Sequence, residues 1–215
     1  MIIRKARAED ADFLAEAVLH SDKSGTSQGS YAGIYQLDEE VIKAALKTII
    51  LEDPGGFELS LRCFRILEEE GKAVATLSAW IEAENGVSSA LSKLTALSFV
   101  LPKAVMEGAR ERLRIASGIS IERTPGTLQI ESVFTLEAFR GRRYTSRLME
   151  SVVGEFKKIK PDLSIMQIQL MKENESALKA YLHAGFVPAY SRTSDNDYIC
   201  EMMPGRTKLL MEKNI

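Results

Sequence analysis

One segment of the sequence combines a β-prone run, a tight basic turn and the start of a long helix. The run over 127–136 predicts a strand, and an apolar stripe after Gly141 predicts a helix to Lys158. Such a junction exposes unpaired backbone N–H groups at the positive end of the helix dipole, which suits a pyrophosphate. Arginines that could add charge are Arg140, Arg142, Arg143 and Arg147. A solvated basic helix start would carry the same residues, so both interpretations stay open.

A second segment, residues 174–186, places polar and aromatic residues at helical spacing. Asn174 is a good N-cap, and Ala177 and Tyr181 share one helix face. Gly185 suits the end of the helix, with Phe186 available to pack behind it. A capped packing helix explains all five residues, so by themselves they do not indicate chemistry.

Hydrophobic periodicity predicts the elements that must position these segments. A strand over 2–5 and a helix over 8–19 open the chain, and Asp38 can cap a second helix that ends at 53–56. Runs over 62–67 and 73–82, joined by a turn containing Gly71, predict an antiparallel pair. Further strands are expected over 127–136 and 166–170 and within 190–203.

Residues 85–126 are too many for a structureless loop in a compact domain. Two stretches have helical spacing, one marked by Leu91, Leu94, Leu97 and Leu101 and the other, after Pro102, by Val105, Ala109, Leu113 and Ala116. We expect a largely helical insertion whose leucine stripe is buried against another surface. The order of elements predicts an α/β (α+β) architecture, in which a mixed sheet is flanked by helices, within one domain over 1–215.

Composition excludes several classes of function. The 215 residues carry a net charge of −2, which gives no general attraction to nucleic acid or anionic membranes. No signal peptide and no membrane-spanning run is present. Cys63 and Cys200 match no metal-ligand spacing and are expected to be buried, reduced thiols. The sequence therefore predicts a soluble cytoplasmic protein without a metal site.

Taken together, the segments resemble the GCN5-related N-acetyltransferase (GNAT) family. Phe139-Arg140-Gly141 is similar to the start of the family's acetyl-coenzyme A loop, Gln/Arg-x-x-Gly-x-Gly/Ala. Residues 174–186 match the family's Asn-x-x-Ala-x-x-x-Tyr-x-x-x-Gly-Phe at every fixed position. The similarity covers 2–84 loosely and 127–203 well. It implies a mixed, mostly antiparallel sheet of six to seven strands with about four helices, and it places the helical insertion between strands three and four.

The match departs from the family in the basic turn. Arg143 and Thr145 stand where the family has its two small residues. Glycine lets the backbone approach a pyrophosphate closely, so Arg143 puts the tightness of phosphate binding in doubt, although its N–H and guanidinium could still contact phosphate.

The resemblance implies acetyl-coenzyme A as co-substrate and a set of residues that bind it. Its pantetheine arm would pair with the strand before the turn, and its phosphates would lie on the turn. By position the implied residues are Phe134, Thr135, Leu136, Arg140, Gly141, Arg142, Arg143, Tyr144, Thr145 and Asn174.

The resemblance also implies direct attack by a neutral amine on the thioester. Tyr181 matches the tyrosine that protonates the departing thiolate, and packing of its helix is an alternative role. Glu131 stands where some relatives place a carboxylate that takes a proton from the amine, with Glu82 and Glu84 as weaker candidates.

Other interpretations remain open. The altered turn would also suit a catalytically silent acyl-coenzyme A sensor on the same fold, and the arginine cluster could suggest nucleic acid, but no aromatic residues are interleaved with it. The acceptor can be a small-molecule amine or a protein or peptide amine, and a homodimer is one assembly the sequence allows. The insertion would lie on the acceptor side or at a contact between copies.

Overall fold

The computed structural model describes residues 1–215 and contains a seven-stranded sheet with eight α-helices. The strand order is β1-β2-β3-β4-β5-β7-β6, and every neighbouring pair is antiparallel except β4 and β5. This confirms the expected mixed, mostly antiparallel sheet. The strands are β1 (Ile2–Lys5), β2 (Phe64–Glu69), β3 (Lys72–Ile81), β4 (Leu128–Thr135), β5 (Ile165–Met171), β6 (Val187–Thr193) and β7 (Thr207–Asn214).

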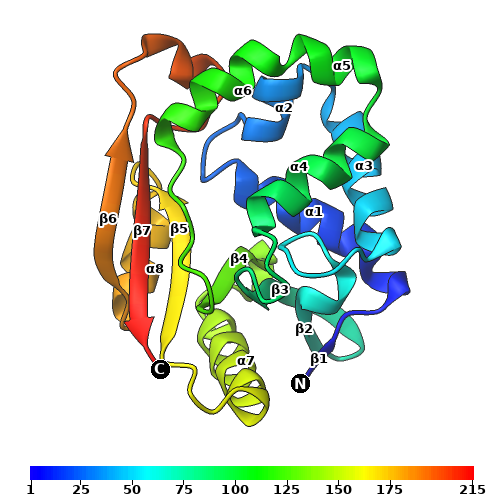
Figure 1. The fold of residues 1–215 in the computed structure, drawn as a ribbon. Coiled ribbons are helices and arrows are strands. Elements are labelled where there is room, and N and C mark those ends of the chain that lie inside the picture. Colours follow the sequence, from blue (N-terminus) through cyan, green and yellow to red (C-terminus); the bar gives the residue numbers. More distant parts are fainter.

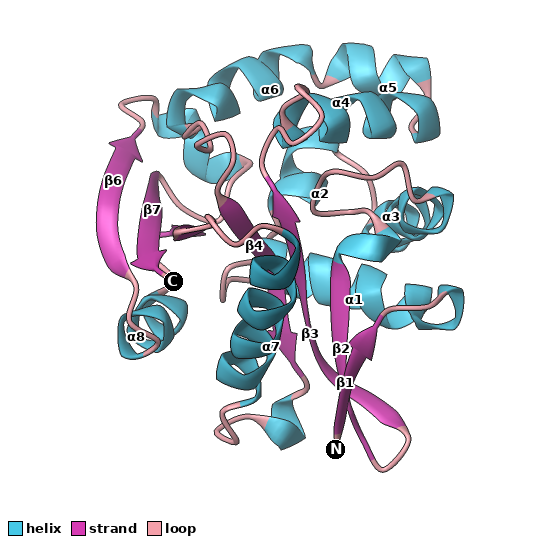
Figure 2. Ribbon diagram, turned by 60° about the horizontal axis from the view of Figure 1, so that its bottom comes forward, coloured by secondary structure: helices cyan, strands magenta, loops and turns pink.

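Helices cover both faces of the sheet (Figures 1 and 2). One layer consists of α1 (Ala11–Asp22), α2 (Ser30–Tyr35) and α3 (Glu39–Glu52), and the other consists of α7 (Tyr144–Ile159) and α8 (Glu175–His183). Successive side chains of a strand point to opposite faces of the sheet, so one strand contributes to both cores. Ile66 packs into the α1–α3 cluster, and its neighbour Leu67 packs into the α7–α8 cluster. None of the helices has both the length and the hydrophobicity needed to cross a bilayer.

Strands β4 and β5 pair over a short distance only. The parallel register joins Leu128–Ile130 to Met166–Ile168 and then ends, although both strands continue. A bulge at this point places an extra residue in β4 between Glu131 and Phe134, and Ser132 adopts a φ of 51°. The bulge bends β4 away from β5, so the rest of β4 has a backbone edge without a strand partner.

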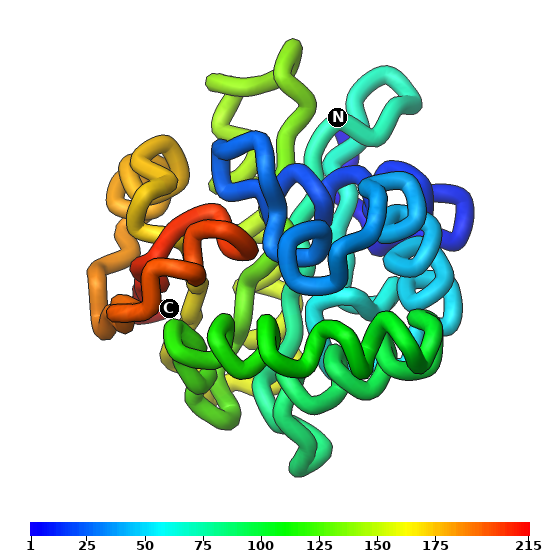
Figure 3. The backbone as a smooth tube through the Cα atoms, turned by 90° about the horizontal axis from the view of Figure 1, so that it is seen from above, coloured from blue at the N-terminus to red at the C-terminus, as the bar shows by residue number.

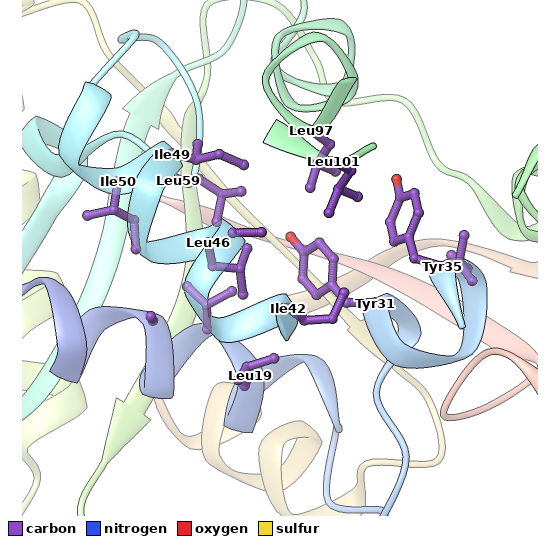
Figure 4. Close-up of a cluster of buried hydrophobic side chains, with 14 of the residues drawn as sticks. Leu19, Tyr31, Tyr35, Ile42, Leu46, Ile49, Ile50, Leu59, Leu97 and Leu101 are labelled. Atoms are coloured by element: carbon purple, nitrogen blue, oxygen red, sulfur yellow. The ribbon is translucent and has the colours of Figure 1, made fainter. Parts of the chain in front are cut away.

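Residues 85–126 contain α4 (Ser89–Val100), α5 (Lys103–Gly108) and α6 (Arg110–Ala116). Helix α4 packs against α3, and α5 and α6 run along α2 (Figures 1 and 3). Leu97 and Leu101 are 4% and 5% exposed and lie close to Tyr31 and Tyr35 of α2 (Figure 4). Leu91, by contrast, is 55% exposed. The predicted leucine stripe is therefore buried in its C-terminal half only.

Several local expectations need correction. The helix α2 was not expected, because its residues follow a stretch rich in glycine and serine. The last strand, β7, begins beyond 190–203, where the chain instead forms a 3₁₀ turn over Asp197–Glu201. Asp38 occupies the N-cap of α3 but its side chain accepts no capping hydrogen bond. Cys63 is buried as expected, whereas Cys200 is exposed.

Two contacts hold α7 against the sheet, one near the C-terminal end of the helix and one at its start, next to the basic turn. Arg65 of β2 is buried and donates two hydrogen bonds of 2.7 Å to the carboxylate of Glu155. The Tyr144 hydroxyl donates to Glu69 at 2.6 Å. Both bonds join α7 to β2, so the position of the turn depends on the sheet that carries β4.

Leu97→Ala is expected to destabilise the protein by roughly 2–5 kcal/mol, because truncating a buried leucine loses transfer energy and leaves a cavity. Leu91→Ala on the same exposed helix is the matched control and is expected to change the free energy of unfolding by less than about 0.5 kcal/mol. Urea unfolding followed by circular dichroism measures both. Equal, small effects would mean that α4 is not an integral part of the core.

Candidate functional site

The basic turn presents a run of unpaired backbone donors. From Gly141 to Ser146, six consecutive amides have no hydrogen-bond acceptor within the protein, and the first bond of the helix is donated by Arg147 to the carbonyl of Arg143. Helix α7 places the positive end of its dipole behind these amides. Such an arrangement can bind an anion such as a pyrophosphate.

Arg143 takes the backbone conformation that favours glycine. Its φ is 59°, in the left-handed region, which costs a residue with a Cβ roughly 1–2 kcal/mol. The turn thus takes a conformation that glycine adopts without strain, although an arginine stands at this position. Arg143 is exposed and its guanidinium has no partner, so it is free to contact a ligand.

The other arginines of the turn are partly engaged. The guanidinium of Arg142 lies 3.3 Å from Glu69 and stacks 4.9 Å above the ring of Phe139. The Nε of Arg140 donates to the carbonyl of Thr135 at 3.4 Å. The side chain of Tyr144 is buried, so Tyr144 can contribute to anion binding through its amide only. Thr145 also offers a free backbone amide.

Not all the residues of β4 that the sequence predicted present their backbone groups at the open edge. The amide of Leu136 donates to Val74 of β3, and because backbone direction alternates along a strand, Phe134 also pairs with β3. The expectation that Phe134 and Leu136 present backbone groups to a ligand is therefore corrected. Thr135 and the unpredicted Val133 face the open edge. The ring of Phe134 packs instead on Phe13 and His20 of α1, at centroid distances of 5.9 and 5.1 Å.

A cavity of about 480 Å³ lies where β4 and β5 separate. Its floor consists of Glu131 and Ser132 of β4, Gln169 to Met171 of β5, and Lys208 of β7. Helices α1 and α2 and residues 90–123 supply the walls, so the segment between β3 and β4 encloses the site. The volume is within the range of small-molecule sites.

Glu131 lines this cavity, as a candidate base should, but it is not a free carboxylate. Its Oε1 accepts a short hydrogen bond from Arg123, whose guanidinium also lies 5.3 Å from the centre of the Trp80 ring. The second oxygen of Glu131 has no hydrogen-bond partner, and the side chain is 27% exposed. One oxygen therefore remains available to a ligand.

Glu82 and Glu84, the weaker candidates, are not placed for chemistry. Glu82 is buried and accepts hydrogen bonds from the indole of Trp80 at 3.0 Å and from the amide of Ser89 at 2.9 Å. Glu84 is exposed and does not line the cavity. Glu82 has a structural role at the start of α4.

Tyr181 lies in α8, outside the cavity lining, with its ring packed on Phe186 at 5.9 Å. Burial, together with the charge of Glu131, raises the pKa of its phenol, so the hydroxyl keeps its proton at neutral pH. The hydroxyl makes no hydrogen bond within the protein. Asn174 caps α8 through its Oδ1, which accepts the amide of Ala177 at 3.1 Å, as predicted.

Sequence reasoning missed five charged residues of the cavity: Asp22, Glu58, Lys93, Arg123 and Lys208. They come from α1, from the connection before β2, from α4, from the residues before β4, and from β7. No motif links them, and only the fold brings them together. Nowhere do three or more His, Cys, Asp or Glu side chains cluster in a way that could hold a metal ion.

A family model described as "Acetyltransferase (GNAT) family" matches residues 34–186. An N-acetyltransferase from Staphylococcus aureus Mu50 shares the fold with a TM-score of 0.68 at 17% identity, over 99% of this chain and 100% of the other. A ribosomal-protein-alanine N-acetyltransferase from Brucella melitensis aligns with a TM-score of 0.52 at 15% identity, over 100% of both chains. A mutant agmatine N-acetyltransferase aligns with a TM-score of 0.54 at 12% identity, over 100% of this chain and 99% of the other. No curated protein matches the sequence significantly.

Lys208→Met is expected to raise the free energy of unfolding at pH 7. Burial, with the nearby cation Lys93, lowers the pKa of Lys208 from 10.5 to about 8. Below pH 8 both states hold the proton and the native state bears the full cost of the charge. Between pH 8 and 10.5 the native state releases its proton first, so stability rises with pH. The shift corresponds to at most about 3 kcal/mol.

Urea unfolding from pH 7 to pH 10 tests this, with the exposed Lys172→Met as control. The stability difference between Lys208→Met and the wild type should shrink as pH rises, and the control should show no such trend. A variant less stable than the wild type at pH 7 would show that the ammonium group stabilises the fold.

Proposed function

We propose that this chain, which belongs to the acetyltransferase (GNAT) family, transfers the acetyl group of acetyl-coenzyme A to a primary amine. The observation that carries the proposal is that three features of the structure follow one another in space. Six free amides at the start of α7 lie next to the open edge of β4, and this edge leads to the cavity lined by Glu131. A phosphate group, an extended arm and an acceptor would each find a matching surface there.

The basic turn would hold the phosphates of the co-substrate. The amides from Gly141 to Ser146 would donate to the pyrophosphate, and Arg140, Arg142 and Arg143 would add charge. Val133 and Thr135 would pair with the pantetheine arm as a strand edge pairs with a peptide. Asn174 has a free side-chain nitrogen, because only its Oδ1 is used in capping α8, and this nitrogen could donate to the same arm.

In the chemical step the amine nitrogen would form a bond to the thioester carbonyl carbon while the carbon–sulfur bond breaks. The free oxygen of Glu131 would take the proton that the amine loses, directly or through water. Tyr181 would give its proton to the departing sulfur, and its raised pKa keeps that proton available. The charge of Glu131 contributes to the raised pKa of Tyr181, which supports a site in which the two groups act on the same thioester.

A catalytically silent acyl-coenzyme A sensor is the second candidate. Two observations favour it: Arg143 holds a strained conformation in the turn, and Glu131 is ion-paired with Arg123. A thiol-release assay with acetyl-coenzyme A and a broad amine panel separates the two functions. Release with any amine supports the enzyme, whereas cofactor binding without release supports the sensor.

We also propose that residues 1–215 form one acetyltransferase domain in which 85–126 is an insertion that governs acceptor choice. The support is that Leu97, Leu101 and Ile119 belong to the same buried cluster as α1 and α3. We further propose a reducing, cytoplasmic location, because Cys63 and Cys200 are both free thiols.

Arg140→Glu is expected to weaken binding of coenzyme A by tenfold or more while changing the affinity for pantetheine little, because the lost interaction is with phosphate. Arg110→Glu, an exposed arginine of α6 away from the turn, is the matched control. Calorimetric titration of each protein measures the dissociation constants. Equal losses for both ligands, or no binding of acetyl-coenzyme A by the wild type at millimolar concentration, would contradict the assignment.

Tyr181→Phe is expected to lower the rate of acetyl transfer by about 10²-fold or more while leaving acetyl-coenzyme A affinity nearly unchanged. The change removes the proton donor and keeps the ring that packs on Phe186. Single-turnover measurements isolate the chemical step from product release.

Glu131→Gln serves as the contrast, because it acts on the acceptor side of the reaction. Its defect should shrink as pH rises, since more of the amine is then already neutral, whereas the defect of Tyr181→Phe should not shrink in this way. Full single-turnover rates for Tyr181→Phe at every pH would leave Tyr181 with a packing role only.

A further inference from the structure

The cavity at the separation of β4 and β5 contains equal numbers of acidic and basic side chains. The acids are Asp22, Glu58 and Glu131, and the bases are Lys93, Arg123 and Lys208. Equal numbers would allow three ion pairs, but the structure forms only two. The remaining charges show what the cavity is able to bind.

The two ion pairs account for most of the charge. Lys93 lies 2.6 Å from Glu58, and Arg123 forms the short contact with Glu131. Asp22 is used locally, because one of its oxygens accepts a short hydrogen bond from the Ser30 hydroxyl and the other accepts the amide of Tyr31 at 3.0 Å. Asp22 thereby holds the start of α2 and forms no ion pair.

Lys208 is the charged residue of the cavity for which the structure gives neither an ion pair nor a hydrogen bond. Its ammonium group has no ion pair and no hydrogen bond within the protein, although the side chain is partly buried and lines the cavity. A second cationic donor is also unused, since the Nε of Arg123 is buried without a hydrogen-bond partner. The Oε2 of Glu58 is also buried without a partner. The spare cationic donor that is accessible from the cavity is therefore the ammonium group of Lys208.

Packing alone does not explain a lysine at this position. Lys208 lies in β7 opposite Met171 of β5, which also lines the cavity. An apolar side chain of similar length would fill the space without the cost of desolvating a charge. An unpaired, partly buried ammonium group facing a cavity is better explained by a ligand that supplies the counter-charge.

We propose that the acceptor is an amine that also carries an anionic group, a carboxylate or a phosphate, and that Lys208 binds this group. The proposal rests on the proposed acetyl transfer, with the amine at the free oxygen of Glu131. The anionic group lies toward β7, where Lys208 is located. Leu94, Leu97 and Leu113 form an apolar wall of the cavity, which suits the non-polar part of such an acceptor.

Two matched pairs of compounds test the proposal on the full chain saturated with coenzyme A, at pH 7. L-Leucine and leucinamide differ in a carboxylate, and O-phosphoethanolamine and ethanolamine differ in a phosphate. Calorimetry on the coenzyme A-saturated protein measures binding, and a separate thiol-release assay with acetyl-coenzyme A in place of coenzyme A measures turnover. Both are run on the wild type, on Lys208→Met and Lys208→Arg, and on the exposed control Lys172→Met.

We expect the wild type to bind the anionic member of one pair at least tenfold more tightly than its neutral partner, and the identity of that pair tells carboxylate from phosphate. Lys208→Met should lose tenfold or more of this affinity while changing that of the neutral partner by less than twofold. Lys208→Arg should retain the preference, and Lys172→Met should match the wild type. Coenzyme A affinity should be the same in all four proteins.

The proposal is overturned if the wild type prefers neither anionic compound, if Lys208→Met weakens both members of a pair equally, or if its main effect is on coenzyme A. Preferential binding of an anionic compound that depends on Lys208, without any thiol release, would support the anion site and refute acetyl transfer. Thiol release that is equal for the two members of each pair would support acetyl transfer and refute the anion site.

Discussion

The separation of β4 from β5 is the constraint on which the rest of the site depends. A parallel pair that ends after Ile130 and Ile168 leaves later backbone groups of β4 without a strand partner and opens space between the two halves of the sheet. The carbonyls at this edge accept side-chain hydrogen bonds from Ser21 and Arg140, whereas the amides do not pair with a strand. The bulge at Ser132 makes the separation abrupt. Within a sheet such an edge is normally costly, because buried backbone groups need hydrogen bonds. Here the edge is next to a cavity, so a ligand can satisfy these groups.

Charge is arranged differently at the two ends of the site. The basic turn uses backbone amides and exposed arginines, which remain hydrated until a ligand arrives. The cavity instead holds its charges in close ion pairs, with Glu58 bound to Lys93 and Glu131 bound to Arg123. Ion pairs reduce the cost of burying charge. They also hold Glu131 in place. The charged groups left with unused hydrogen-bonding capacity are the second oxygens of Glu131 and Glu58, the Nε of Arg123 and the ammonium of Lys208.

The segment between β3 and β4 combines structural and functional roles. Its buried residues Leu97, Leu101 and Ile119 belong to the core that α1 and α3 also form, while other residues of the segment line the cavity. The same helices therefore contribute to the stability of the fold and to the shape of the cavity.

The sequence by itself determined the features that depend on neighbours along the chain. Helical spacing and the N-cap Asn174 predicted α8, the strand–turn–helix order predicted the basic turn, and the position of Arg143 marked the place where the backbone adopts a left-handed conformation. Only the tertiary structure decided which side chains meet. Lys208 comes together with Glu131 and Asp22 because three separate elements converge at the gap. The bulge in β4, which is also a feature of the tertiary structure, decides that Val133 and Thr135 face the open edge. Local patterns record propensity and periodicity, whereas pairing of distant charges depends on register and packing, which no short segment encodes.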